Sequence, residues 1–132
     1  MPFPLDEKYI IQTEEKLSVR FPDSFRIKMI IENGGELETK ITDWVLHPVF
    51  DTSDKKRIKR TSNDIIRETA SAKEWIGFPE NAVAIGINAF GDCLILLTSK
   101  SDPNVLDNPV YFWDHETGHV KKFAQPDVVT SV

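Results

Sequence analysis

A single cysteine, Cys93, is the first candidate for chemistry in this chain. A cysteine acts as a nucleophile when a histidine base lies close enough to take its proton. Cys93, however, begins the apolar run CLILL, and a free cysteine in such a run usually packs as a small buried hydrophobe. We therefore expect Cys93 in the core and predict no catalytic residue. A lone cysteine also excludes an internal disulfide, which is typical of a cytoplasmic protein.

Two histidines four residues apart, His115 and His119, flank Glu116. On a helix this spacing would place both imidazoles on one face, where they could hold a metal ion. Here the two histidines lie on either side of a predicted turn, and the helical H-E-x-x-H order is missing. The sequence therefore predicts no metal site and no cofactor.

Several carboxylates lie on predicted strands and turns, namely Glu36 and Glu38, Asp92, and Asp114 with Glu116. Two carboxylates held close together raise the pKa of one of them and create a general acid. Exposed strand carboxylates more often solvate a surface or protect a sheet edge. Both interpretations are open from sequence, and we favour the solvated surface.

The charge of the chain is unevenly distributed. The net charge is −5, but residues 51–60 (DTSDKKRIKR) carry +3, which leaves −8 for the remainder. An acidic body repels a phosphate backbone and attracts basic partners. The basic stretch is short and has no interleaved aromatic residues, so we interpret it as a solvated loop or as the lead into the next helix. The sequence therefore predicts a basic protein partner and no nucleic acid.

Aromatic side chains are the remaining candidates, because they anchor many protein interfaces. Trp44, Trp75 and Trp113 are the largest of them. Tyr111 and Trp113 share one face of a predicted strand while Phe112 points to the other. Each side of the sheet therefore needs cover from a helix or from a partner.

The elements that position these residues begin with helices. Residues 5–17 (LDEKYIIQTEEKL) combine a helical rhythm with acids at the start. Residues 21–38 (FPDSFRIKMIIENGGELE) predict a second helix, with Pro22 in its first turn, apolar residues every four positions and a stop at 33–35 (NGG). A third helix is predicted from the capping residues 61–64 (TSND) to about Trp75.

Strand patterns follow the stop at 33–35 and fill the last third of the chain. Residues 36–41 alternate and predict a strand with one wet face, and a second strand is expected at 44–50 with Pro48 at an edge or a break. AVAIGI (82–87) and CLILLT (93–98) flank a turn and predict a hairpin. VYFWDH and HVKKF flank ETG, which predicts a three-residue loop with Gly118 in the left-handed conformation.

These patterns predict a single α+β domain over residues 1–132. The domain contains a mostly antiparallel sheet of five or six strands, with N-terminal and central helices packed on it. The composition, with 40% hydrophobic and 28% charged residues, is typical of a soluble globular protein. The start MPFPLDEKYI lacks the features of a secretory signal, and the apolar runs are too short to span a bilayer. We expect a cytoplasmic protein that does not contact membranes.

Three motifs in order resemble the SUKH superfamily, which includes the Smi/Knr-type regulators of cell-wall assembly. RFPDSFRIKMIIENGGE is similar to its N-terminal motif, in which Leu-Pro, an aromatic residue, an apolar pair and Asn-Gly-Gly recur. WIGFPENAVAIGINAFGDCLILL is similar to the second motif, and PVYFWDHETGHV to the third, so that the resemblance covers residues 7–123. Two features depart from the family's pattern: KKFAQPDVVTSV replaces a closing helix, and AFGD shortens a glycine-rich turn.

The resemblance implies a non-enzymatic binding module. Bacterial members often act as immunity proteins that neutralise a toxin from a neighbouring or sibling cell, while eukaryotic members act as interaction hubs. An acidic body suits the first role, since many such toxins are basic nucleases. Two alternatives stay open: a scaffold or regulatory protein without a toxin partner, and a small hydrolase that uses acids and a histidine.

The candidate partner-binding residues are acids and aromatics near the sheet that we expect to be exposed. They are Glu36, Glu38, Asp43, Trp44, Asp92, Trp113 and Asp114.

Overall fold

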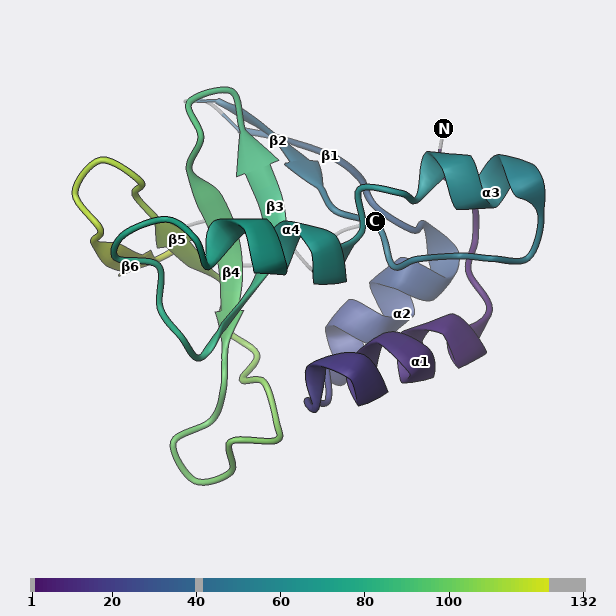
Figure 1. The fold of residues 1–132 in the computed structure, drawn as a ribbon, viewed down its shortest axis with the longest axis horizontal. Coiled ribbons are helices and arrows are strands. Elements are labelled where there is room, and N and C mark those ends of the chain that lie inside the picture. The colour runs from purple at the N-terminus through teal and green to yellow at the C-terminus, as the bar shows by residue number, and fades with distance from the viewer. Residues whose placement is uncertain (1, 40–41, 124–132) are drawn as a thin grey trace.

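The computed structural model of the chain describes residues 2–39 and 42–123, which form four helices and one six-stranded sheet (Figure 1). The elements in chain order are α1 (Glu7–Leu17), α2 (Asp23–Ile31), β1 (Gly35–Glu38), β2 (Asp43–Leu46), α3 (Lys55–Arg60), α4 (Ile65–Ala72), β3 (Ala82–Asn88), β4 (Cys93–Leu97), β5 (Tyr111–Trp113) and β6 (Val120–Lys122). This arrangement confirms the predicted α+β fold class.

The strand order in the sheet is the same as the order in the chain, β1 to β6, and every neighbouring pair is antiparallel. The sheet is therefore a meander with β1 and β6 at its edges. The predicted hairpin of β3 and β4 is present, with one register shift between Ala84 and Gly86. Since the side chains of a strand alternate between faces, this register decides which residues share a surface.

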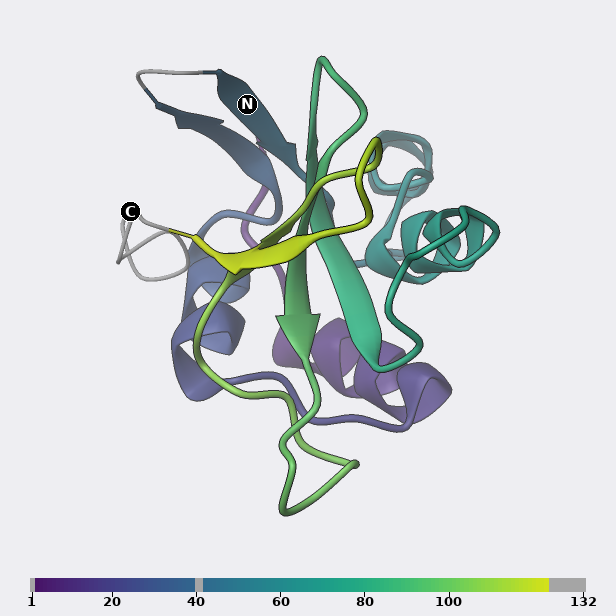
Figure 2. The same cartoon turned by 90° about the vertical axis from the view of Figure 1, so that its left-hand side faces the viewer.

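Helices pack against both faces of the sheet. α4 crosses in front of β3 and β4, while α2 lies on the opposite side (Figures 1 and 2). Two buried clusters correspond to these two layers. The first contains residues of α1, α2, β2, β3 and β4 together with Ile65 at the start of α4. The second lies between Ala72 at the end of α4, Phe78 and strands β3 to β5.

The end of α2 explains the Asn-Gly-Gly sequence by backbone chemistry. The Asn33 side chain donates from Nδ2 to the Val49 carbonyl and accepts from the Val49 N–H, both at 2.8 Å, so it pairs like an extra strand residue. Gly34 and Gly35 both have φ near +97°, a region that disfavours other residues. A Cβ on Gly34 would also lie 3.2 Å from the Leu46 carbonyl oxygen. Pro22 is the N-cap of α2 and precedes its first turn.

The basic stretch is the clearest departure from the predicted elements. Residues 55–60 form the six-residue helix α3, where a loop or a lead into the next helix was predicted. Asp54 caps this helix, because its side chain accepts a hydrogen bond from the Arg57 N–H at 2.8 Å. Lys56, Arg57 and Arg60 lie over the ring of Phe3, with Arg57 closest at 4.4 Å from the ring centre.

The aromatic residues of β5 alternate as predicted. Phe112 packs edge-on against Trp44 in the first core, and Trp113 packs edge-on against Phe78 in the second. At the following turn, the Asp114 N–H donates to the His119 carbonyl at 3.0 Å, so residues 115–118 form a loop of four residues where three were predicted. Gly118 has a φ of +75°, which confirms its left-handed conformation.

Because His47 is buried, we expect the fold to lose stability at acidic pH. Its side chain is 3% exposed, and its Nδ1 atom has no hydrogen-bond partner among the described residues. Burial lowers the pKa of His47 from 6.5 to about 4. The unfolded chain therefore binds a proton more readily, and the free energy of unfolding falls as the pH falls from 6.5 towards 4, by about 3 kcal/mol. Urea unfolding between pH 7 and pH 4 measures this loss of stability. The loss should be smaller in His47→Leu and unchanged in the control His119→Gln, which alters an exposed histidine.

Some predictions fall on residues that the structure does not describe. Ile41, expected on the strand of Leu37, and the tail at 124–132 lie outside the described residues. Over 2–39 and 42–123, helices long and apolar enough to span a bilayer are absent.

Candidate functional site

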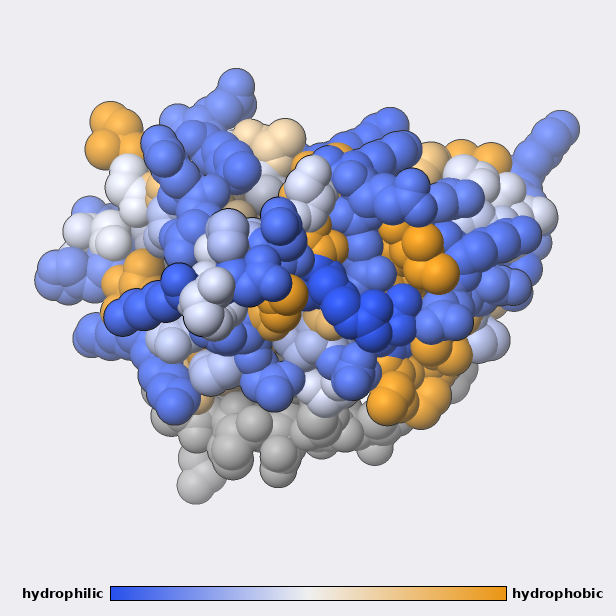
Figure 3. All heavy atoms as spheres, turned by 90° about the horizontal axis from the view of Figure 1, so that it is seen from below, coloured by the Kyte–Doolittle hydropathy of each residue, from blue (hydrophilic) through white to orange (hydrophobic). Residues whose placement is uncertain are grey.

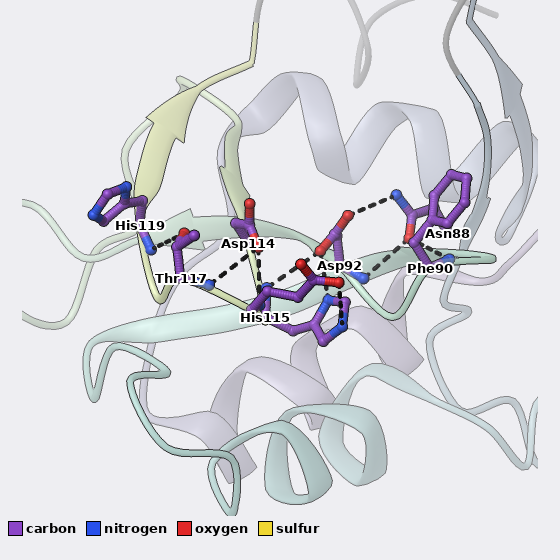
Figure 4. A network of polar contacts seen from close by, with 8 residues as sticks. Asn88, Phe90, Asp92, Asp114, His115, Thr117 and His119 are labelled. Carbon is purple, nitrogen blue, oxygen red and sulfur yellow. Dashed lines mark hydrogen bonds and ion pairs between the residues drawn. The ribbon is translucent and has the colours of Figure 1, made fainter.

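A polar network joins the turn between β3 and β4 to the turn between β5 and β6 (Figure 4). Asp92 lies at its centre. One carboxylate oxygen of Asp92 lies 2.7 Å from Nδ1 of His115 and accepts from the His115 backbone N–H at 3.2 Å. The other oxygen accepts from Nδ2 of Asn88 at 3.2 Å. The amide oxygen of Asn88 in turn accepts from the backbone N–H groups of Phe90 and Asp92, which fixes the first turn.

The second turn is held by its own residues. Asp114 accepts at Oδ1 from the N–H groups of Glu116 and Thr117, at 2.9 and 3.3 Å. The hydroxyl of Thr117 accepts from the His119 N–H at 3.2 Å. The structure therefore pairs His115 with Asp92, across 23 positions in sequence, and His119 takes part only through its backbone.

The two partners shift each other's ionisation. Burial acts to raise the pKa of Asp92, but the hydrogen bonds from His115 and Asn88 outweigh it, so this pKa is lowered. The hydrogen bond to Asp92 raises the pKa of His115, and the negative charges of Asp92, Glu116 and Asp114 add to the effect. Each partner therefore favours the charged form of the other, an ionised carboxylate beside a protonated imidazole.

Asp92→Asn should lower the pKa of His115 towards its ordinary value, since the largest cause of the raised pKa is removed. NMR titration of the imidazole measures this change. In the wild type, the pair stabilises the fold between the lowered pKa of Asp92 and the raised pKa of His115. That stabilisation is lost as the pH rises through the pKa of His115. Asp107→Asn, at an exposed site, is the control; an unchanged His115 pKa in Asp92→Asn would show that the hydrogen bond is not the cause.

Asp92, Asp114 and His115 are also the residues that could hold a metal ion. Their ligand atoms lie within 4.8 Å of one another. Each ligand group is already engaged, because Asp92 and His115 bond to each other and Asp114 accepts two backbone N–H groups. These bonds explain the arrangement without a metal, and we base no metal site on it.

The strand acids lie together on one face of β1 and β2. Glu38 is directly opposite Asp43 across the two strands, and Glu36 is two positions along β1, opposite Val45. All three acids are exposed. Within the described part of the chain, their carboxylates make no ion pair or hydrogen bond. Carboxylates elsewhere do lie within 4.0 Å of a basic side chain, namely those of Glu7, Glu14, Asp23, Glu32, Asp51, Asp54, Asp64, Asp92 and Glu116.

Two predicted contact residues are buried, so the expectation that they are exposed is wrong. Trp44 is 2% exposed in the first core and Trp113 is 1% exposed in the second. The burial follows from their strand positions, because both side chains point to faces that helices or Phe78 cover. Asp92 is also largely buried, at 9% exposed. The predicted acids form two separate groups, one in the turns (Asp92 and Asp114) and one on the strands (Glu36, Glu38 and Asp43). Among the described residues, neither hydrogen bonds nor ion pairs join the two groups.

Cys93 is buried at the start of β4, as predicted for a core residue. Burial raises the pKa of its thiol to about 11, with further contributions from the charges of Asp92 and Glu68. A thiol with such a pKa holds almost no thiolate at neutral pH, so it is a poor nucleophile. Of the acids and histidine named for the alternative of a small hydrolase, the structure brings Asp92, Asp114 and His115 together. Cys93 is not an activated nucleophile beside them.

Two apolar side chains beside the strand acids were not predicted as candidates: Val45 and Ile87 are 45% and 37% exposed on the same face as Glu36. Beyond α4, Trp75 is 56% exposed, and its neighbour Ile76 is 96% exposed. The alternation of 43–46 (DWVL) contained a signal for Val45, because a strand that buries its tryptophan must expose the next residue. On the side of α1 and α2, hydrophilic side chains dominate and apolar ones lie in separate patches over the described residues (Figure 3).

Comparison with known proteins gives one family. The model of the family described as SMI1 / KNR4 family (SUKH-1) matches residues 4–126, nearly the whole chain. No curated protein and no solved structure matches the chain.

Proposed function

Because the chain belongs to the SMI1 / KNR4 family (SUKH-1), we propose that it is a protein-binding module of the immunity type, which binds a cognate toxin and neutralises it. Family membership supports a protein-interaction or immunity-type module, and the family is generally non-enzymatic. The observation that carries the proposal is the group of exposed strand carboxylates, which pair with no basic side chain among residues 2–39 and 42–123, in a chain of net charge −5. These groups favour a basic toxin domain as the partner, inside the cytoplasm of the cell that it protects.

The acids predicted from the sequence remain the proposed contact residues. Glu36, Glu38 and Asp43 would meet the partner directly, while Asp92 and Asp114 would shape the neighbouring turns. Trp44 and Trp113 would act from the two cores, by fixing the strands that carry these acids. In this proposal the buried side chains act only by positioning the exposed acids, and none of them contacts the partner.

An enzymatic function is less well supported. A histidine base activates a nucleophile only within hydrogen-bond reach, and the Cys93 thiol is buried with a pKa of about 11. The lowered pKa of Asp92 also makes this carboxyl a poor proton donor near neutral pH. The contacts of Asp92 and His115 are those of a structural ion pair that joins two turns.

The proposal is tested by producing the chain together with the C-terminal toxin domain encoded by the neighbouring gene. We expect the two proteins to co-purify and the chain to restore the growth of cells that the toxin arrests. A toxin domain that elutes separately and kills in the presence of the chain contradicts the immunity role. Co-purification with a different, non-toxic protein would instead support the scaffold function.

A further inference from the structure

One face of the sheet is covered over only half of its width. The register aligns Glu36, Val45, Ile87, Cys93 and Trp113 in a single row across five strands. The exposed fraction falls along this row. It is 45% for Val45 and 37% for Ile87, but only 7% for Cys93 and 1% for Trp113. The second core therefore ends between Ile87 and Cys93, and the β1–β2 side of the face is uncovered. We call Glu36, Glu38, Asp43, Val45 and Ile87 the open half-face.

The charges of the open half-face all have one sign. Glu38 and Asp43 are direct cross-strand neighbours, and like charges at such positions destabilise a sheet. Glu36 adds a third carboxylate on the same face. A cation supplied by a partner and placed among them would remove this repulsion. The half-face is therefore electrostatically complementary to a basic partner.

The surface is also hollowed beside Glu36 and Val45. A cavity of about 480 Å³ lies there, with residues of the sheet on one wall and Arg60, Thr61 and Asn63 on another. Glu32 and Asp51 also line this cavity. Clefts of this size accept a ligand or several partner side chains. A projecting side chain of a partner could therefore enter next to the open half-face.

We infer that the open half-face is the docking surface for a basic protein segment, in which lysine or arginine side chains flank an apolar one. The cations would meet the three carboxylates, and the apolar side chain would cover Val45 and Ile87. A nucleic acid or an anionic membrane would be repelled by the same carboxylates. A second copy of the chain, docked by a two-fold axis, would place these acids against themselves. This inference rests on the proposed function in one respect: the toxin domain is taken to be the protein that carries the basic segment.

Glu38→Lys distinguishes an effect on binding from an effect on folding, because it should raise the stability of the free chain and lower its affinity for the partner. In the free chain, the new lysine faces Asp43, so the thermal midpoint should rise by about 1–3 °C. At the interface it opposes the cations of the partner, so the affinity should fall at least about tenfold. The matched control is Glu15→Lys, which makes the same charge change at an exposed site on α1. Val45→Thr keeps the shape of the strand residue and should weaken binding about three- to tenfold.

Two probes distinguish this inference from the proposed function. The first is the toxin domain: binding that Glu38→Lys and Glu15→Lys reduce equally, or not at all, overturns the inference and leaves the immunity role intact. The second needs no toxin and uses a capped Lys-Val-Lys-Val-Lys peptide with its Glu-Val counterpart. NMR shifts at Val45 and Ile87 with the lysine peptide alone support the surface even if the toxin does not bind. Equal shifts with both peptides, or none at millimolar concentration, contradict it.

Discussion

Trp113→Ala is expected to lower the free energy of unfolding by about 3–5 kcal/mol, because it empties the centre of the second core. The side chain is 1% exposed, its ring lies 5.2 Å from that of Phe78, and its Nε1 donates to the Gly77 carbonyl at 3.1 Å. The substitution removes both the packing and a partner of a backbone carbonyl. Urea unfolding followed by circular dichroism measures the loss.

The control for this effect is Trp75→Ala, which deletes a tryptophan that is 56% exposed. It should cost less than about 1 kcal/mol, because little buried surface is lost. Similar costs for the two variants would show that Trp113 is not a core residue. The comparison also matters for function, since loss of binding in Trp113→Ala would report unfolding rather than a lost contact.

Asn33→Ala is expected to cost about 2–5 kcal/mol, because it leaves two backbone groups of Val49 without partners. Val49 is fully buried, and both of its groups bond to the Asn33 side chain at 2.8 Å. This contact attaches the end of α2 to the segment after β2. A lower thermal midpoint and faster hydrogen exchange of the Val49 amide would both report its loss.

The matched control is Asn104→Ala in the exposed connection after β4, which should change stability by less than about 0.5 kcal/mol. Asn33→Asp gives a further test, because it keeps the acceptor for the Val49 N–H and removes the donor to its carbonyl. It should slow hydrogen exchange at Val49 relative to Asn33→Ala. An alanine variant as stable as the wild type would contradict the role assigned to Asn33.

Most elements could be predicted from the sequence, because their signals are local. Asp6 and Asp64 cap helices within three residues of the groups that they bind, and Gly118 adopts the left-handed turn that its position predicts. The hairpin of β3 and β4 follows from two apolar runs on either side of one short turn. Family membership was likewise predictable, because it depends on motifs in a fixed order.

The site was harder to predict, because its contacts are distant in sequence. Asp92 and His115 are 23 positions apart, and only the packing of β4 against β5 brings their turns together. The open half-face required knowledge of which strands the helices leave uncovered. The burial of Trp44 was not predicted for the same reason. Its place on a strand follows from the local pattern, whereas its contact with Phe112 depends on a residue distant in sequence. Helix α3 was missed because its stabilising contacts include Phe3, which is far away in the chain.

We propose that this chain binds a basic protein through exposed acids. Isothermal titration of the toxin domain from the neighbouring gene into the wild-type chain and into the double variant Glu36→Lys/Glu38→Lys tests it most directly. We expect a tight one-to-one complex for the wild type, an affinity that falls as salt is added, and a loss of affinity of at least about a hundredfold in the double variant. Absence of heat with the wild type, or equal affinity for both proteins, would contradict it.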